Sequence, residues 1–242
     1  MPETLAAIVA GVALGFLSLK NNSILLGFFL ARRNSWRFGI SLNDIDDLSF
    51  WLVIVGLLGA RIYYVLFSWD YFSRYPNELY QIWHGGLSIY GAVLAGLVFA
   101  YFYSKRKAYT FWQLADVLAL SLPLAQAVGR FGNFINQEAY GTPTTLPWKM
   151  NVHGQFVHPT FLYEAIADVA VFLILRKLLG RVKSGVLTIV YIGTYSLFRF
   201  FIEALRTDSF FIFGFRGDQL MAFLLIMACG LMFYRRQLSI EK

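Results

Sequence analysis

The chain has 242 residues, of which 58% are hydrophobic and only 14% are charged, and its mean hydropathy is +0.57. Soluble domains carry about 25% charged residues, so this composition excludes a soluble protein and indicates an integral membrane protein. The formal net charge of +7 does not indicate nucleic-acid binding, because the basic residues lie between apolar runs, where membrane topology accounts for them. A single cysteine, Cys229, excludes an intrachain disulfide.

Seven apolar runs predict an all-α integral membrane protein with about seven transmembrane helices. About 20 helical residues are needed to cross a hydrocarbon core of about 30 Å. The first run is interrupted by polar residues 20–23, so it is either one broken helix or a short helix followed by an interfacial piece. The runs cover residues 5–31, 48–67, 87–103, 112–128, 159–179, 185–205 and 218–234.

Positive charge is concentrated in every second connection between these runs. Thirteen of the 21 Lys and Arg residues fall on one side of the membrane if the chain crosses it seven times. The positive-inside rule then predicts an N-terminus outside and a C-terminus in the cytoplasm. Two long loops, 68–86 and 129–158, would lie on the outer face. We therefore expect a single polytopic membrane domain over residues 1–242, with its functional face outside.

The glycine-rich stretch 129–141 is the strongest local signal for function. It follows a long apolar run, yet it carries an arginine, a glutamate, two asparagines and three glycines. Charged groups at membrane depth are costly, so they are kept where they face a cavity or a ligand. Glycine lets a backbone approach a ligand closely, and the planar fork of Arg130 suits phosphate. These residues predict a phosphate-bearing ligand at the membrane surface.

A second polar group recurs along the sixth run, where Tyr195, Arg199, Glu203 and Arg206 follow one another at intervals of four, four and three. These intervals place all four side chains on one helix face. One interpretation is an internal Glu–Arg pair that neutralises charge, with Arg206 reaching toward the headgroups. The other is an anion site lined by the two arginines and oriented by Glu203. Two arginines against one glutamate leave a positive surplus, which favours the anion site.

Other polar residues have ordinary structural interpretations as well as functional ones. Arg61, near the outer end of the second run, either snorkels to the headgroups or lines the same cavity. Glu164, one turn from Asp168 near the start of the fifth run, is typical of a helix cap. Asp116 is expected to be a structural residue at the start of the fourth run. Tyr90, taken alone, is an ordinary interfacial tyrosine.

Three classes of protein remain open from these residues alone: an enzyme acting on a phosphate-bearing lipid, a transport protein and a membrane scaffold. A lipid flippase or an anion channel with an arginine-lined pathway would also explain charges inside the membrane. It explains their clustering on the outer half less well. In a scaffold, polar residues would only hold helices together, which leaves the glycine-rich stretch unexplained.

Several segments together resemble one family, the bacterial prolipoprotein diacylglyceryl transferases. Residues 129–141 are similar to the family signature Gly-Arg-x-Gly-Asn-Phe-Ile-Asn-x-Glu-x-x-Gly, and the resemblance runs from about residue 40 to about 236. The first run lacks the Tyr-Gly element usual in the family. The other matching segments are 59–67, 85–91, 158–164 and the residues Tyr195, Arg199 and Glu203.

The resemblance implies a reaction in the bacterial cytoplasmic (inner) membrane. The diacylglyceryl group of phosphatidylglycerol would be transferred to the lipobox cysteine thiol of a preprolipoprotein, forming a thioether and releasing glycerol 1-phosphate. The partners would be phosphatidylglycerol, the lipobox peptide and membrane lipid, with no nucleic acid. No metal and no organic cofactor is implied, and the three histidines lack metal-ligand spacing.

The resemblance also implies roles for individual positions. Arg130 would bind the phosphatidylglycerol headgroup, and the substrate-binding set would comprise Arg130, Asn133, Gly141, Arg61 and Arg206. The catalytic set would comprise Tyr90, Glu138, Arg199 and Glu203. Tyr90 stands where some members of the family carry a histidine. The group that takes the thiol proton stays open among Tyr90, Glu138 and Glu203.

Overall fold

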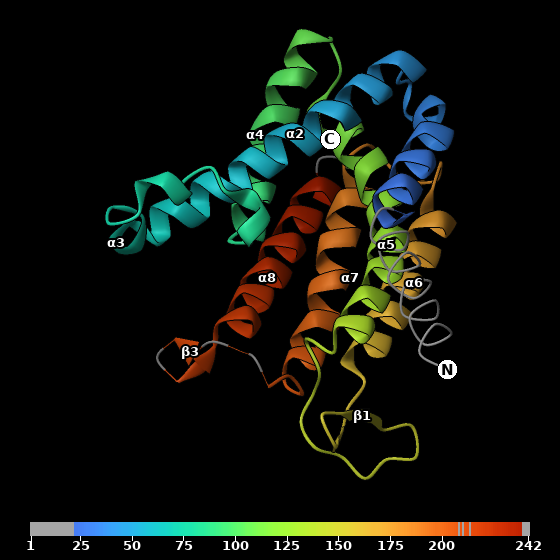
Figure 1. Ribbon diagram of the computed structural model, residues 1–242. Coiled ribbons are helices and arrows are strands. Elements are labelled where there is room, and N and C mark those ends of the chain that lie inside the picture. The colour runs from blue at the N-terminus through green and yellow to red at the C-terminus, as the bar shows by residue number, and fades with distance from the viewer. Residues whose placement is uncertain (1–21, 208, 210, 213, 239–242) are drawn as a thin grey trace, which may run out of the picture. The chain divides into compact units, whose positions relative to one another are not determined.

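The computed structural model describes residues 22–207, 209, 211–212 and 214–238, and most of them are helical (Figure 1). The chain divides into two compact units. Residues 32–115 form one unit, and the described residues within 22–31 and 116–238 form the other.

The 32–115 unit is built on two long helices, α2 and α4, joined by three short helical turns. The two helices approach closely at glycines, because a Cβ atom on Gly59 would lie 2.7 Å from the carbonyl oxygen of Gly91. Small residues at such a crossing let helix backbones pack tightly in membranes. The elements are η1 Ser35–Phe38, α2 Leu42–Phe67, α3 Trp69–Phe72, η2 Pro76–Glu78, η3 Ile82–His84 and α4 Ile89–Arg106.

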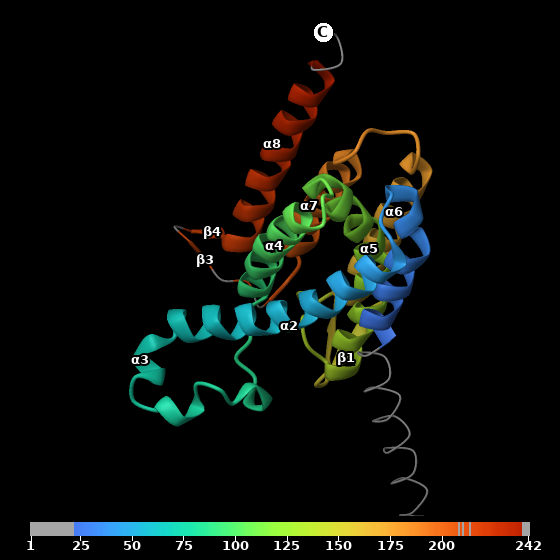
Figure 2. The same ribbon diagram turned by 90° about the horizontal axis from the view of Figure 1, so that it is seen from above.

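The second unit is a group of helices in which α6 packs on α7 and α7 packs on α8 (Figure 1, Figure 2). The N-terminal part of α5 belongs to the first unit, and its remainder, from Asp116, lies in this group. Residues 22–31, which are helical, pack near α5, where a Cβ atom on Gly27 would lie 3.3 Å from Cβ of Ala125. The helices are α5 Phe111–Asn136, α6 Thr160–Leu178, α7 Val186–Glu203 and α8 Gly217–Leu238.

Asp116 has a structural role, but not the one expected from the sequence. It lies inside α5 and caps the start of α7 instead of its own helix. Its carboxylate accepts hydrogen bonds from the backbone N–H groups of Gly185 and Thr188 and from the Thr188 hydroxyl. These N–H groups have no partner within α7, so the buried carboxylate satisfies them.

Two short antiparallel hairpins interrupt the helical architecture, which the all-α prediction did not include. In the first, β1 Met150–Val152 pairs with β2 Gln155–Val157. In the second, β3 Phe211–Ile212 pairs with β4 Phe215–Arg216. The first lies in the predicted loop 129–158, and the second connects α7 to α8.

Helix α5 is longer than the sequence predicted, because it continues past residue 128 to Asn136. Gly132 does not end it, since a glycine inside a helix costs only about 1 kcal/mol. The helix ends where the backbone N–H of Glu138 donates to the carbonyl oxygen of Asn133 at 3.0 Å. Gln137 takes the left-handed conformation there, with φ of +53°. The first half of the glycine-rich stretch is therefore helical.

Four of the described helices are long and apolar enough, by length and composition, to cross a membrane. Many large apolar side chains on them are exposed, as expected for helices that face lipid. Helices α4 and α6 occupy the predicted third and fifth runs, and most of the first run lies outside the described residues. The chain is a mainly helical, multi-pass membrane protein. The four candidate spans are Leu42–Phe67, Phe111–Asn136, Val186–Glu203 and Gly217–Arg236.

Candidate functional site

Arg130, near the end of α5, reaches α6 and α7 with its guanidinium group. Its Nη1 lies 3.2 Å from Oε2 of Glu164, and its Nε lies 4.0 Å from Oδ2 of Asp168. Its Nη2 donates a hydrogen bond of 3.2 Å to the hydroxyl of Tyr195. The side chain of Arg130 is 20% exposed, so it is not fully enclosed by the helix group.

Glu164 is the residue that three arginines share. Besides Arg130 at its Oε2, it is paired through Oε1 with Nη1 of Arg199 and lies 3.4 Å from Nη1 of Arg206. The cap role expected from the sequence is wrong, because Glu164 lies inside α6 and its side chain is only 4% exposed. A buried carboxylate needs such partners to stay ionised. Glu164 thus joins the ends of α5, α6 and α7.

Arg199 connects α7 to its neighbours on two sides. Its Nη2 lies 2.8 Å from Oε2 of Glu203 and 3.0 Å from Oδ2 of Asp218, which is in the first turn of α8. Nε of Arg206 lies 3.7 Å from the same oxygen of Glu203. The predicted helix face is therefore confirmed for Arg199 and Glu203, whereas Arg206 lies beyond the end of α7 and reaches Glu203 from the following segment.

Arg216, in the second hairpin, fixes the segment that follows α7. Its Nη1 donates hydrogen bonds to the carbonyl oxygens of Glu203 and Arg206 at 2.8 and 2.7 Å. The same nitrogen donates to the hydroxyl oxygen of Ser209 at 2.8 Å, and that hydroxyl donates to the carboxylate of Glu203. Both the backbone and the carboxylate of Glu203 are thereby held in place.

Charge in this group is balanced, which corrects the positive surplus inferred from the sequence. Three arginines form ion pairs with four carboxylates, and Arg216 adjoins them through Ser209. A phosphate therefore has to compete with carboxylates for the arginines. We call this set the arginine cluster: Arg130, Arg199, Arg206, Arg216, Glu164, Asp168, Glu203 and Asp218.

A small cavity of about 10 Å³ lies among α5, α6 and α7. Its polar lining residues are Arg130, Glu164, Asp168, Tyr195 and Arg199, and the rest of its lining is apolar. A single water molecule needs a volume of roughly 10 to 15 Å³, so a phosphate does not fit inside. A lipid headgroup would therefore contact the arginines at their exposed edge or after they exchange partners. The apolar walls lower the local dielectric constant and strengthen the electrostatic interactions of the cluster.

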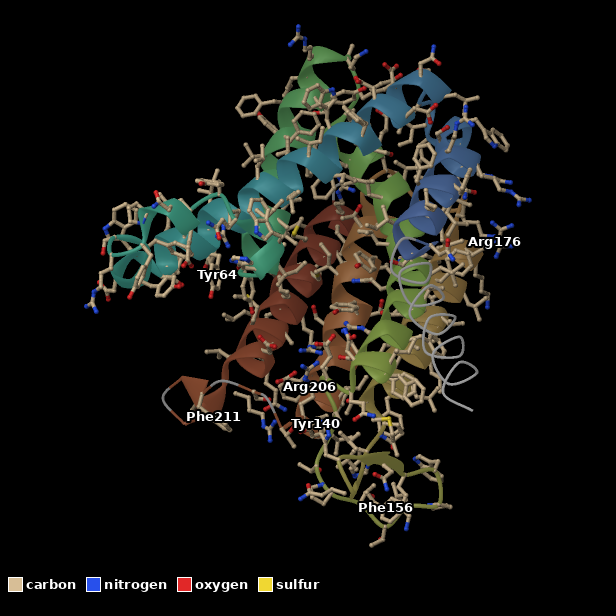
Figure 3. All side chains as sticks on the ribbon, in the orientation of Figure 1. Tyr64, Tyr140, Phe156, Arg176, Arg206 and Phe211 are labelled. Carbon is tan, nitrogen blue, oxygen red and sulfur yellow. The ribbon has the colours of Figure 1, made fainter. Side chains whose placement is uncertain are left out.

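Gly141 brings the segment after α5 against the end of α7. Its backbone N–H donates to the carbonyl oxygen of His158 at 3.0 Å, and it forms an isolated β-bridge with Arg206. A Cβ atom here would lie 2.7 Å from Cβ of His158 and 2.9 Å from the carbonyl oxygen of Leu205. Only glycine fits this position. Figure 3 shows Arg206 and Tyr140 at the same end of the helix group.

Asn133 and Glu138 lie close to the cluster in sequence but are not joined to it. Glu138 is exposed, and its carboxylate accepts a hydrogen bond of 2.7 Å from Nδ2 of Asn136. In the described part of the chain, neither Asn133 nor Glu138 forms an ion pair or hydrogen bond with Arg130 or Arg199. The structure thus brings Arg130, Arg199, Glu203 and Arg206 together without these two residues, whose roles stay predictions.

Arg61 and Tyr90 belong to the 32–115 unit. Arg61 is buried and donates to four backbone carbonyl oxygens, those of Glu78, Leu79, Gly85 and Gly86. It does not snorkel to the headgroups, and these contacts anchor the connection between α2 and α4. Its substrate-binding role stays a prediction. Tyr90, the second residue of α4, is 40% exposed, and its ring lies 6.4 Å from that of Tyr63. Its catalytic role stays a prediction.

Neither the central part played by Glu164 nor the contributions of Asp168, Asp218 and Arg216 were predicted from the sequence. Glu164 and Asp168 were noticed only as a pair one turn apart in the fifth run. Their separation of four residues could have indicated a shared face turned toward neighbouring helices. Asp218 follows a hairpin and has no periodic partner, so the sequence held no comparable signal for it.

Comparison with known proteins identifies the family of the chain. The model of the prolipoprotein diacylglyceryl transferase family matches residues 18–235. The chain belongs to the prolipoprotein diacylglyceryl transferase family. It is 46% identical over 218 residues to the phosphatidylglycerol–prolipoprotein diacylglyceryl transferase of Fervidobacterium nodosum, covering 85% of this chain and 75% of the relative.

Two further relatives carry the same name, phosphatidylglycerol–prolipoprotein diacylglyceryl transferase. The protein of Finegoldia magna is 42% identical over 207 residues, which is 85% of this chain and 84% of the relative. The protein of a Nostoc species is 44% identical over 217 residues, or 83% of this chain and 77% of the relative. Membership of this family favours group transfer over the transport and scaffold alternatives.

Proposed function

We propose that this protein transfers the diacylglyceryl group of phosphatidylglycerol to the cysteine thiol in the lipobox of a preprolipoprotein. The observation that carries the proposal is the arginine cluster, in which Arg130 of the family signature and Arg199 meet at Glu164. The proposal further places the protein in the cytoplasmic membrane of a bacterium. It would cross that membrane seven times, with its N-terminus outside and its C-terminus in the cytoplasm.

The reaction is a displacement at a glycerol carbon. The sulfur of the substrate cysteine forms a bond to the glycerol carbon of the diacylglyceryl group, and the bond between that carbon and the phosphate oxygen breaks. The electron pair of the broken bond goes to the phosphate oxygen, which leaves on glycerol 1-phosphate. The thiol proton passes to an acceptor on the protein or to the leaving phosphate. No other reactant is needed.

The arginines suit this reaction because negative charge gathers on the leaving phosphate. Arg130 makes one contact through each of its two terminal nitrogens, so each nitrogen keeps an N–H group for a phosphate oxygen. Hydrogen-bond donors that are already in position within a low-dielectric site can lower the activation barrier by several kcal/mol. In other enzymes, loss of a single such donor costs about 2.7 to 4 kcal/mol. The carboxylates around Arg130 and Arg199 fix the orientation of the two guanidinium groups.

Two of the three candidate proton acceptors differ in accessibility. Glu203 is only 1% exposed and is occupied by Arg199, Arg206 and the Ser209 hydroxyl. Glu138 is exposed and has a single amide partner. Of the two, we favour Glu138 as a residue that meets the substrate thiol, and Glu203 as one that orients the arginines.

The proposal is tested with purified protein, vesicles that contain phosphatidylglycerol and a lipobox peptide, followed by mass spectrometry of the peptide. We expect the peptide mass to increase by one diacylglyceryl group. A peptide with serine in place of the cysteine, and vesicles of phosphatidylcholine alone, are the matched controls and should show no increase. Absence of the product with active, folded protein, or an equal product from phosphatidylcholine, would overturn the proposal.

A further inference from the structure

Asp168 differs from the other carboxylates of the arginine cluster in how it is paired. Its side chain is 2% exposed, and its only ion pair in the described part of the chain is with Nε of Arg130 at 4.0 Å. Its Oδ2 is buried and has no hydrogen-bond donor there, which is also true of one carboxylate oxygen each of Glu164 and Glu203. Glu164, one turn earlier on α6, is shared by three arginines. Glu164 therefore connects three arginines of the cluster, whereas the one ion pair of Asp168 among the described residues is with Arg130.

The carboxylate of Asp168 adds little to the stability of the folded structure beyond what Glu164 already provides. It makes no short contact, and burying a poorly paired charge is costly. It also lines the same small cavity as Arg130 and Tyr195. Its main physical effect is to reduce the positive potential at Arg130, the arginine of the family signature.

That effect matters most after the reaction. A phosphodiester such as phosphatidylglycerol carries one negative charge, whereas a phosphate monoester carries about 1.5 to 2 at neutral pH. An arginine that binds the phosphodiester would therefore hold the departing glycerol 1-phosphate more tightly. A negative charge beside the arginine weakens the binding of both the phosphodiester substrate and the phosphate monoester product. It weakens binding of the more highly charged product more strongly.

We infer that Asp168 is a positioning residue whose negative charge competes with phosphate for Arg130 and so promotes release of the phosphate-bearing product. The inference rests on the proposed function and adds a determinant of product release to it. Asp168 does not touch the reacting atoms; it acts through Arg130.

The test is product inhibition. Wild-type protein, Asp168→Asn and Asp168→Glu are compared in the transfer assay with added glycerol 1-phosphate, and KM for phosphatidylglycerol is measured alongside. Asp168→Asn should lower the inhibition constant of glycerol 1-phosphate by about tenfold, the size expected for loss of a partly screened charge at this distance. KM should fall by a smaller factor, and Asp168→Glu, which keeps the charge, should stay near the wild-type inhibition constant.

A purely structural role would not produce this pattern. Asp116→Asn is the matched control, because it neutralises another buried carboxylate that caps α7 and forms no ion pair in the described residues. It should reduce the amount of active protein without changing the inhibition constant. Asp168→Ser serves as a second uncharged variant if the asparagine variant fails to fold.

The inference is overturned if either uncharged variant at position 168 keeps the wild-type inhibition constant. It is also overturned if Asp116→Asn lowers that constant equally. Failure of the proposed function looks different: the wild-type protein would then show no transfer, or glycerol 1-phosphate would not inhibit it at all.

Discussion

Replacement of Glu164 by glutamine should be among the most disruptive single changes in the helix group. Glutamine keeps the shape of the side chain but removes the charge that Arg130, Arg199 and Arg206 share. The side chains of these arginines are 20%, 17% and 11% exposed, so solvent screens their charges only in part. Each arginine would lose its contact with the same carboxylate at once.

The magnitude follows from the burial of the pairs. Removing one partner of a buried ion pair costs about 3 to 5 kcal/mol. Arg130 and Arg199 keep other partners after the change, so we expect the lower end, about 3 kcal/mol. For a chain of this size, that corresponds to a fall in Tm of roughly 6 to 12 °C. A loss of this size is a large part of the roughly 5 to 15 kcal/mol that separates folded from unfolded proteins.

The assay is thermal unfolding of the purified variant in detergent, followed by its transfer rate at a temperature where it is folded. Glu138→Gln is the matched control, since the exposed Glu138 has one amide partner and its loss should cost about 0.5 kcal/mol or less. We expect Glu164→Gln to have a lower Tm and a much lower transfer rate. A Glu164→Gln variant with wild-type Tm would refute Glu164 as the residue that organises the cluster.

Three further changes test separate parts of the account. Gly141→Ala should lower both the Tm and the transfer rate, because its Cβ atom would meet a side-chain carbon at 2.7 Å and a carbonyl oxygen at 2.9 Å; an unchanged Tm would show that the segment yields easily. Cys229→Ala should leave the transfer rate unchanged, because the substrate supplies the thiol, and loss of activity in a folded variant would instead indicate a covalent enzyme intermediate. Arg199→Ala and Glu203→Ala should each impair transfer severely, and the double variant should recover neither stability nor activity, because Glu164 still loses a partner; a stable, fully active double variant would remove this helix face from the site.

The helices could be predicted because each long apolar run has to form its backbone hydrogen bonds within itself in a membrane. The extension of α5 to Asn136 could not, since glycines at positions 129 and 132 suggested a loop, yet helix packing overrides weak local preferences. The hairpins were missed because two or three paired residues leave no periodic pattern. Seven crossings and the orientation of the termini remain predictions.

The site was predictable where its residues share one helix or one motif. Arg199 and Glu203 follow a helical interval within α7, and Arg130 lies in the glycine-rich stretch. The contacts of Glu164 join helices that are distant in sequence, so no interval reveals them. The contacts of Arg61 could not be predicted for another reason: all four of its acceptors are backbone carbonyl oxygens, which no side-chain pattern can indicate.

The most direct test of the central claim is transfer from phosphatidylglycerol by Arg130→Lys. Lysine keeps the positive charge beside Glu164, so the variant should insert and have a Tm close to wild type, but it lacks the planar fork that binds phosphate through two N–H groups. We predict that wild-type protein adds one diacylglyceryl group to a lipobox peptide and that folded Arg130→Lys does so far more slowly, with Arg130→Ala inactive. Wild-type transfer rates in both variants would contradict the assignment of Arg130 to the phosphate.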